Sequence, residues 1–279
     1  MTKKFSEKAP FVPLEYRYEV EKVLYKGKSK FQKIMVFENP YFGRMLILDG
    51  AVQLTERDEF FYHEMLTHVV MHVHPNPKKI VVIGGGDGGT VREVLKHNTV
   101  EKVYFVEIDK RVTEISKKFF PTIVCDIKDP RIEIKNMDGA DFIRKQHSDI
   151  DIVIVDSTDP IGFAKSLFSE KFFASVKNSL TDNGMFVTHS ESLLLHKDIV
   201  IEVQEMLKKV FPIVDLYTAP IATYPGNWWT FSVAAKKLNP RQMKRKFKIN
   251  TKYYNDEIHQ YAFLPKSLYE KLMQRKLAW

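Results

Sequence analysis

The segment Val81–His97, VVIGGGDGGTVREVLKH, is the stretch of sequence that decides the fold. With the preceding Ile80, its first three residues form a short, uninterrupted apolar run over 80–83, which is typical of a strand buried on both faces. Glycines at 84, 86 and 89 then follow the spacing G-x-G-x-x-G, and a helix is predicted over 90–97. Strand, glycine loop and helix in this order predict a nucleotide-binding unit of the Rossmann type, in which glycine lets the backbone approach a ligand closely.

Downstream of this segment, strands and helices alternate. Apolar runs predict strands over 103–106, 132–135, 150–155, 185–188 and 229–234. Helical periodicity predicts helices over 112–119, 168–180 and 199–210. Buried strands separated by helices predict an α/β fold with a parallel, doubly wound sheet, whose ligands bind at the carboxyl ends of the strands.

Upstream of the glycine loop, the pattern is one of short strands. Strands are predicted over 16–24, 32–37, 44–48 and 52–54, with turns at 38–40 and at Asp49-Gly50. The period then changes over Asp58–His72, which predicts a helix with Asp58 as its N-cap. Pro75 and Pro77 follow. We therefore expect an N-terminal β-strand domain with a linking helix over 1–75, and a Rossmann-like catalytic domain over 76–279.

Composition limits the class of protein. Of the 279 residues, 44% are hydrophobic and 28% are charged, as expected for a globular chain with a sizeable core. A single cysteine, Cys125, excludes a disulfide within the chain and fits a reducing cytosol. Because the sequence has neither a signal peptide nor an apolar run of about 20 residues, we expect a cytoplasmic protein without membrane attachment.

The net charge of +8 raises the alternative of a nucleic-acid partner. The basic residues gather in Lys236–Lys248, far along the chain from the glycine loop. We interpret this segment as a solvated surface and expect no nucleic acid, although salt-dependent DNA binding would support the alternative.

Acidic residues follow the predicted strands at the edge where a ligand should bind. Asp87 lies inside the glycine loop, where a carboxylate would repel a pyrophosphate and attract a cation. Glu107 follows the second strand, in the position that accepts hydrogen bonds from ribose hydroxyls. Asp138, before Gly139, could accept from an adenine amine, although Asp-Gly is also a common turn. An acidic rim on a basic protein predicts cationic ligands.

Asp156-Ser157-Thr158-Asp159 follows the most strongly apolar strand. An amine is mostly protonated at neutral pH, since its pKa is about 10.4, and a protonated amine cannot attack carbon. Asp156 is placed to remove that proton, and Asp159 to hold an amine by charge. The alternative is that the two carboxylates only cap the following helix.

Several of these motifs, in order, resemble the spermidine-synthase (polyamine aminopropyltransferase) family, over about residues 15–268. The resemblance is carried by LDGAVQLTERDEFFYHEMLTH (48–68), VVIGGGDGGTVREVLKH (81–97), VEID (106–109), DSTDPIG (156–162), SLF (166–168), TYPGNWWTF (223–231) and TKYYNDEIHQYAFLP (251–265). It implies a small N-terminal β domain and a Rossmann-like domain of the class I methyltransferase type. It also implies transfer of the aminopropyl group of decarboxylated S-adenosylmethionine to putrescine, which gives spermidine and 5′-methylthioadenosine. The resemblance implies neither a prosthetic group nor a metal. It implies a homodimer or a homotetramer.

The resemblance also assigns site residues. It implies that Asp156 is the proton acceptor. The polyamine side would comprise Tyr62, His63, Asp87, Asp156, Ser157, Thr158, Asp159 and Tyr224. The nucleoside side would comprise Gln32, Gln53, Glu107, Asp138, Gly139 and Phe163, with Gln53 next to the aminopropyl channel.

The chain departs from the family pattern mainly on the acceptor side. Phe163 stands where the family often has a proline, His189 replaces a common glutamine, and Gly226-Asn227-Trp228 replaces the usual Ser-Gly-Leu. A family tryptophan near the distal amine is missing, with Phe11 or Tyr16 expected in its neighbourhood. The acceptor therefore stays open between putrescine, cadaverine, agmatine and a longer polyamine. Two further alternatives are a methyltransferase that uses intact S-adenosylmethionine and a binding protein without turnover.

Overall fold

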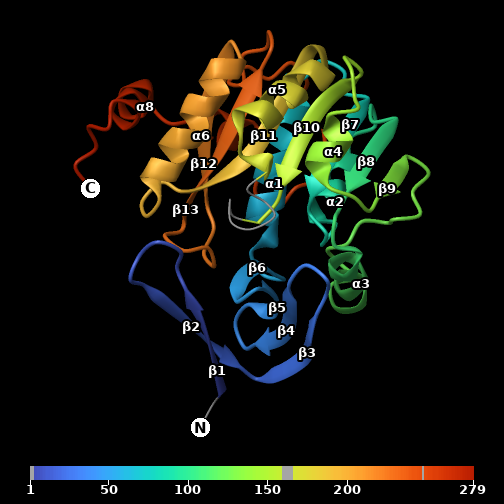
Figure 1. The fold of residues 1–279 in the computed structure, drawn as a ribbon, viewed down its shortest axis with the longest axis vertical. Helices are drawn as coiled ribbons and strands as arrows, with labels where there is room; N and C mark the ends of the chain where they lie inside the picture. Colours follow the sequence, from blue (N-terminus) through green and yellow to red (C-terminus); the bar gives the residue numbers. More distant parts are fainter. Residues whose placement is uncertain (1–2, 159–165, 247) are drawn as a thin grey trace.

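The fold has two stacked units, an N-terminal β unit and a larger α/β unit (Figure 1). The structure is a computed structural model that describes residues 3–158, 166–246 and 248–279. Asp159 and Phe163, which the sequence places in the site, lie outside these ranges. None of the helices within the described ranges is long and apolar enough to cross a membrane.

The N-terminal unit consists of a two-stranded ribbon and a four-stranded antiparallel sheet. The ribbon pairs β1 (Lys3–Lys8) with β2 (Glu15–Val20). The sheet has the order β3-β4-β5-β6, formed by β3 (Lys22–Lys28), β4 (Lys33–Asn39), β5 (Gly43–Leu48) and β6 (Ala51–Thr55). The strand predicted over 16–24 is thus divided between β2 and β3. The turn at Asp49-Gly50 is confirmed, and both residues have a positive φ, which suits the turn that joins β5 to β6.

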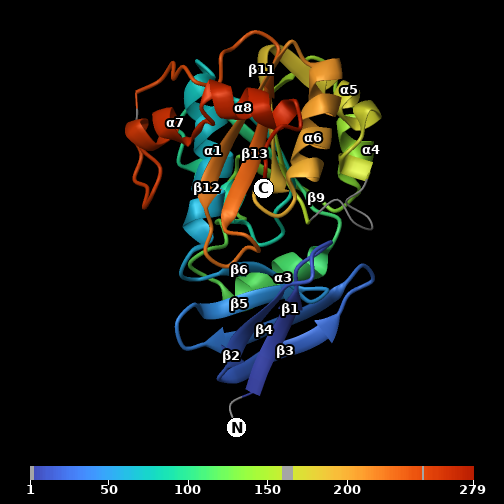
Figure 2. The same ribbon diagram turned by 90° about the vertical axis from the view of Figure 1, so that its left-hand side faces the viewer.

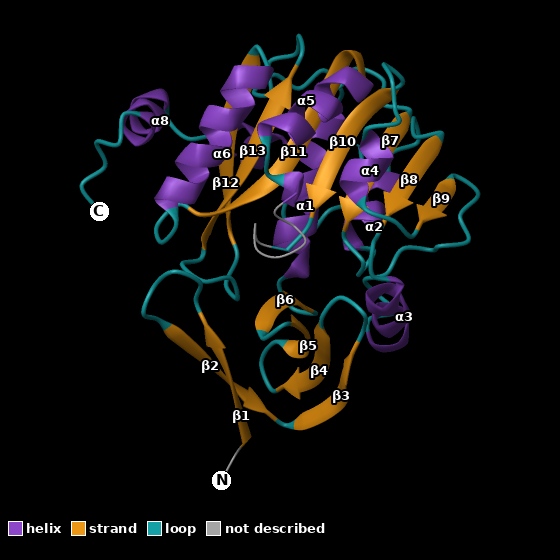
Figure 3. Cartoon of the chain, viewed as in Figure 1, coloured by secondary structure: helices purple, strands orange, loops and turns teal. Residues whose placement is uncertain are grey.

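The α/β unit is built on a seven-stranded sheet of order β12-β13-β11-β10-β7-β8-β9 (Figure 3). Its strands are β7 (Lys79–Gly84), β8 (Lys102–Val106), β9 (Ile132–Lys135), β10 (Ile150–Asp156), β11 (Leu180–Ser192), β12 (Ile213–Pro220) and β13 (Trp228–Ala235). The five strands from β7 to β11 pair in parallel, as predicted.

The last strand of that sheet differs from the prediction. β13 runs antiparallel to both β11 and β12. The sequence pattern missed β12, and a short loop joins β12 to β13, a connection that only an antiparallel neighbour allows. The doubly wound α/β class is confirmed, but the expectation of an entirely parallel sheet was wrong.

Helices cover both faces of the sheet (Figure 2). One face packs against α1 (Glu59–Val73) and α2 (Gly89–Leu95), and the other against α4 (Gly139–Ile143), α5 (Glu170–Ser179) and α6 (Lys197–Val210). Alternate side chains of β7 pack on opposite faces of the sheet. Ile80 and Val82 pack in the core with α1 and α2, and Val81 and Ile83 pack in the core with α4, α5 and α6. Burial on both faces explains why this strand reads as an uninterrupted apolar run. The C-terminal helices are α7 (Asp256–Ala262) and α8 (Lys266–Met273).

Helix α3 (Lys110–Phe119), which follows β8 of the seven-stranded sheet, packs against the β unit. Its Val112 and Ile115 share a core with strands β4 to β6. At its start Asp109 caps the helix, by accepting from the backbone N–H of Arg111. The other oxygen of Asp109 accepts from the side chain of Gln32, at 3.0 Å.

Asp58 occupies the N-cap position of α1, but its carboxylate does not cap the helix. It accepts instead from Thr55 Oγ1 at 2.6 Å and from Thr223 Oγ1 at 2.8 Å. The buried carboxylate thus joins the β unit to the loop after β12, and these partners outcompete the helix end. α1 itself packs into the core of the large sheet. The division of the chain near residue 75 stays a prediction.

In the described part of the basic segment Lys236–Lys248, several cations bind protein groups. Lys236 donates to the carbonyl of Leu180, and Lys237 pairs with Asp182. Arg241 donates twice to Asp215, and Arg245 donates to the carbonyl of Met71. These contacts give the segment a structural role.

Candidate active site

A cavity of about 730 Å³ opens at the carboxyl edge of the parallel strands, between the two units. Among the described residues, every side chain or glycine that the sequence assigned to the site lines this cavity: Gln32, Gln53, Tyr62, His63, Asp87, Glu107, Asp138, Gly139, Asp156, Ser157, Thr158 and Tyr224. The two remaining candidates, Asp159 and Phe163, lie outside the described residues. Residues separated by up to 192 positions in the chain therefore share one hollow.

Strand order places the acids in a row across the cavity. Asp138 follows β9, Glu107 follows β8, Asp87 follows β7, and Asp156 ends β10. Because β9, β8, β7 and β10 are consecutive neighbours in the sheet, their loops succeed one another along its edge. Next to β10 lies β11, which carries His189. The row therefore has a β9 end and a β11 end, with Asp156 toward the latter.

Asp156 is held by two hydroxyl groups. Its Oδ1 accepts from the Tyr62 hydroxyl at 2.9 Å, and its Oδ2 accepts from Thr90 Oγ1 at 2.6 Å. The residue is only 9% exposed. Burial raises the pKa of Asp156, and the nearby Asp87 carboxylate raises it further. A carboxylate with a raised pKa is a better proton acceptor, so these surroundings suit a general base. Nothing in the local sequence pattern pointed to Thr90.

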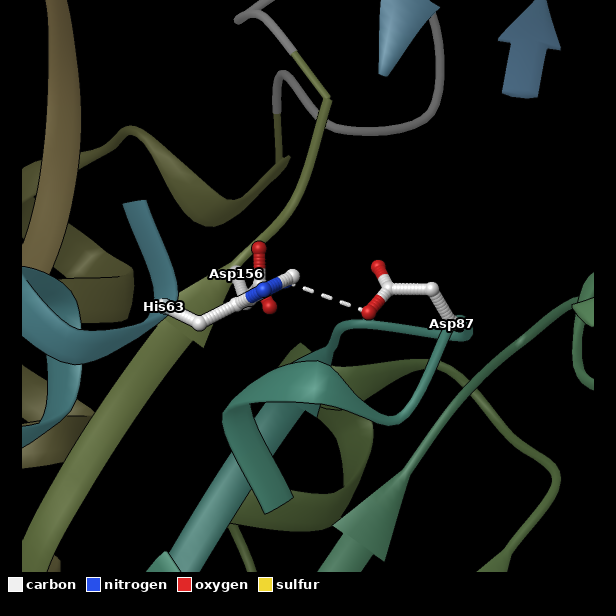
Figure 4. A group of neighbouring side chains, drawn as sticks. All are labelled: His63, Asp87 and Asp156. Atoms are coloured by element: carbon white, nitrogen blue, oxygen red, sulfur yellow. Dashed lines mark ion pairs between the residues drawn. The ribbon is translucent and has the colours of Figure 1, made fainter. Parts of the chain in front are cut away.

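His63 lies beside Asp87 and Asp156, as Figure 4 shows. Its Nε2 is 3.2 Å from Asp87 Oδ1, and its Nδ1 is 2.6 Å from Glu59 Oε2. Burial by itself lowers the pKa of His63, but the Asp87 and Glu59 carboxylates raise it to about 10. His63 is therefore an imidazolium at neutral pH. Burial raises the pKa of Asp87 and His63 lowers it, and the net direction is downward, so Asp87 stays ionised.

Behind His63, Glu59 is clamped by Arg92 of α2. The guanidinium donates to both oxygens of the Glu59 carboxylate, at 3.1 and 2.9 Å. Sequence reasoning missed both residues. The signal for Glu59 was its position four residues before His63 on a predicted helix, where the two side chains share a face. Arg92 had no such signal, because it comes from another helix.

The same group could also receive a cation. His63, Asp87 and Asp156 each offer one ligand atom, and these atoms lie within 4.8 Å of one another. Because His63 is protonated, its ring nitrogens offer no lone pair to a metal ion, and the two carboxylates suit an ammonium group instead.

At the β9 end, Glu107 and Asp138 line the cavity and accept hydrogen bonds from different backbone groups. Burial raises the pKa of Glu107 to about 8, although its Oε1 accepts from the backbone N–H of Asp109 at 2.7 Å. Asp138 Oδ1 accepts from the backbone N–H groups of Ala140 and Asp141 and so caps α4. Asp138 therefore caps a helix and also lines the cavity, and its contact with adenine stays a prediction.

Beyond Tyr62, Ser157 and Tyr224, at the β11 end, the cavity continues into a narrow space of about 40 Å³, which we call the annexe. The residues that line the annexe but not the main cavity are Glu7, Val52, His189, Glu191, His196, Pro225 and Trp229. Sequence reasoning missed Glu7 and Glu191, two buried carboxylates, because their positions in the sequence carry no local signal.

His189 forms part of the annexe wall. Its Nε2 donates to the carbonyl oxygen of Ser157 at 2.7 Å, and its ring stacks on Trp229. The departure from the family glutamine thus supports the backbone next to Asp156. The expected substitutes for the missing tryptophan do not line either space: Phe11 is 72% exposed, and the Tyr16 hydroxyl accepts from the backbone N–H of Gly226.

Replacing Glu59 with glutamine is expected to lower kcat/KM by about ten- to a hundredfold, because a hydrogen bond to a charged group contributes about 1.5–3 kcal/mol. The loss should grow from pH 7 to pH 9. Without the Glu59 charge the pKa of His63 falls from about 10, so the imidazolium is lost at a lower pH and Asp87 loses its partner. The ratio of variant to unmodified kcat/KM, followed across this range, measures the effect.

Glu64→Gln provides the matched control. Glu64 is buried on the same helix, but it accepts from the backbone N–H groups of residues 252–254, away from the cavity. This control should lower the melting temperature and leave the pH dependence unchanged. Equal pH profiles for both variants would contradict a role for Glu59 in the site.

Comparisons with known proteins agree with this geometry. The profile of the Spermine/spermidine synthase domain matches residues 59–245, and that of the Spermidine synthase tetramerisation domain matches residues 5–56. The chain is 54% identical over 269 residues to a polyamine aminopropyltransferase of Hydrogenobaculum, and 52% identical to polyamine aminopropyltransferase 1 of Aquifex aeolicus. Each alignment covers 96% of both chains.

Solved structures give the same result. A spermidine synthase in complex with the transition-state analogue AdoDATO superposes with a TM-score of 0.94 at 37% identity, covering 99% of this chain and 97% of the other. The spermidine synthase of Thermotoga maritima gives a TM-score of 0.92, also at 37% identity, covering 99% and 96%.

Proposed function

Since the chain belongs to the spermine/spermidine synthase family of aminopropyltransferases, we propose that it transfers the aminopropyl group of decarboxylated S-adenosylmethionine to putrescine. The products are spermidine and 5′-methylthioadenosine. The observation that carries the proposal is the row of carboxylates in one cavity, with the buried Asp156 at the β11 end of the row. Both substrates are cationic, and a basic protein with an acidic cavity selects for them.

The donor would lie along the β9 side of the row. Glu107 would bind the ribose hydroxyls, Asp138 and Gly139 the adenine, and Gln32 would contact the nucleoside from the β unit. Asp87 would face the ammonium end of the aminopropyl group. This carboxylate also explains the preference for a donor without a carboxylate, because two negative groups at that point would repel each other.

The reaction would be an in-line displacement. The amine nitrogen forms a bond to the propyl carbon next to sulfur, while the carbon–sulfur bond breaks and sulfur leaves as a neutral thioether. Before the attack, Asp156 takes a proton from the ammonium group of the acceptor, which frees the nitrogen lone pair, and the raised pKa of Asp156 favours this transfer. The cavity contributes alignment of the two reactants, which lowers the entropic part of the barrier.

A short diamine fits the β11 side. Its reacting nitrogen would lie at Asp156, with Tyr62 and Tyr224 along its carbon chain and Ser157 and Thr158 beside it. Its second ammonium group would enter the annexe, where Glu7 and Glu191 supply negative charge. The Oε1 atom of Glu191 has no hydrogen-bond partner among the described residues, as expected of a buried acceptor that receives a ligand.

We further propose a homotetramer, with a homodimer as the smaller alternative, because residues 5–56 match a tetramerisation domain. The division into a β-strand domain over 1–75 and a catalytic domain over 76–279 belongs to the same proposal. The proposal also includes a cytoplasmic location, a polyamine contact of Asp159 and a nucleoside contact of Phe163. Asp159 and Phe163 lie outside the described residues.

Incubation of the protein with decarboxylated S-adenosylmethionine and putrescine tests the proposal. Chromatography should show equal amounts of 5′-methylthioadenosine and spermidine. Intact S-adenosylmethionine in place of the donor should give no product and weaker binding in calorimetry. Transfer of a methyl group from the intact donor would instead support a methyltransferase, and binding without products would support a non-catalytic protein.

A further inference from the structure

A contact between the two units forms part of the wall of the annexe. His196, at the start of α6, places its Nε2 2.8 Å from the carbonyl oxygen of Pro10, to which it donates. Its Nδ1 lies 3.3 Å from Glu191 Oε2. Pro10, Glu191 and His196 all line the annexe, and Glu191 and His196 are buried.

The backbone on both sides of this contact is strained. Phe11, next to Pro10, has a φ of 61°, and Glu191 has a φ of 73°. Positive φ is uncommon for residues other than glycine, and such strain persists only where the surrounding structure imposes it. Glu191 lies where the pairing of β11 with β13 is interrupted, between His189 and Ser192. Because of this interruption, the Glu191 side chain does not follow the regular alternation between the two faces of the strand.

The loop that carries Pro10 is itself tightly closed. The backbone N–H of Ala9 donates to the carbonyl of Leu14, and that of Leu14 donates to the carbonyl of Val12. Proline at 10 and 13 limits the backbone further. A short, braced loop held by one side chain from the other unit is a suitable wall for a substrate site.

The space before this wall is small. A volume of about 40 Å³ holds about three water molecules, at about 10–15 Å³ for each. That is enough for one ammonium group with its hydration, and too little for a further aminopropyl arm.

We propose that the His196–Pro10 contact is the end wall of the acceptor site and restricts the acceptor to short diamines. The inference rests on the proposed aminopropyl transfer, and it assigns His196 as a residue that determines specificity. His196 does not reach the reacting atoms, since it lines the annexe and Asp156 lines the main cavity. Its replacement should therefore change which amines react more than how fast the best one reacts.

A series of amines measures the length limit. The probes are 1,4-diaminobutane, 1,5-diaminopentane, 1,6-diaminohexane and spermidine, each with decarboxylated S-adenosylmethionine, followed by release of 5′-methylthioadenosine. In the unmodified protein kcat/KM should fall by about tenfold or more for each methylene that the pocket cannot hold. In His196→Ala, the ratio of kcat/KM for 1,6-diaminohexane to that for 1,4-diaminobutane should rise at least about tenfold, on the same scale.

His196→Gln is the matched control, because its amide can still donate to the Pro10 carbonyl and should keep most of the length limit. Pro10→Gly is a second variant, which loosens the wall from the opposite side and should also raise the ratio. If His196→Ala fails to fold, Pro10→Gly decides the question by itself.

An unchanged ratio in a folded His196→Ala or Pro10→Gly variant that still uses 1,4-diaminobutane would overturn the inference. So would an unmodified protein that uses spermidine as well as it uses 1,4-diaminobutane. A protein that forms no 5′-methylthioadenosine with any amine would count against the proposed function instead, so the two failures are distinguishable.

Discussion

Replacement of Asp156 with asparagine should lower kcat by about a thousandfold, within the range of about 10²–10⁴ that general acid–base catalysis contributes. The amide keeps the shape of the side chain and can still accept from Tyr62 or Thr90, but it cannot take a proton from an ammonium group. Donor affinity, measured by calorimetry, should change little, because Asp87 and Glu107 are retained. Single-turnover assays with putrescine measure the loss.

Asp151→Asn is a control at the opposite end of the same strand. Asp151 accepts from the backbone N–H groups of Lys78 and Lys79, away from the cavity. This substitution should leave kcat unchanged, whatever it costs in stability. A loss of only two- or threefold in Asp156→Asn would remove Asp156 from the role of base.

Replacement of Gly84 with alanine should destabilise the protein by about 2–4 kcal/mol. A left-handed conformation costs an alanine about 1 kcal/mol, and forced shifts of packed atoms cost about 1–3 kcal/mol more. Gly84 has a φ of 81°, and a Cβ atom there would lie 2.1 Å from the carbonyl oxygen of Asp156. That oxygen also accepts from the backbone N–H of Gly85, so the ends of β7 and β10 would have to separate. Urea unfolding measures the stability, and kcat should fall as Asp156 is displaced.

Gly50→Ala separates strain from steric conflict. Gly50 also has a positive φ, 94°, but a Cβ atom there would meet nothing within 4 Å. It should therefore cost only about 1 kcal/mol, the conformational part alone. Equal losses of unfolding free energy for the two variants would show that the close approach of β7 to β10 does not limit this position.

The residue types within each predicted strand, and those that directly follow it, were enough to predict the acidic residues of the site. A buried strand in a parallel sheet needs apolar side chains on both faces, so each such strand is visible as an apolar run. The residues that end these runs, among them Asp87, Glu107, Asp138 and Asp156, must then meet at one edge of the sheet. No contact had to be known for that inference, only the rule that parallel strands end on the same side.

The antiparallel direction of β13 could not be predicted in the same way. Periodicity tells whether a strand is buried, and it does not tell in which direction the strand runs. That direction depended on β12, whose side chains are less regularly buried than those of the central strands. The N-cap role expected of Asp58 failed for a related reason, because partners from distant segments replaced the local one.

The sequence by itself therefore determined the α/β class, the glycine loop and the row of acids, since each depends on residues close together along the chain. Tertiary structure decided which distant groups meet at the site: Thr90 with Asp156, Arg92 with Glu59, and His196 with Pro10. These pairs join different elements, and the packing of helices and sheets sets their distances. A hydrogen bond requires its atoms to lie within about 3 Å, a condition that spacing along the chain does not reveal.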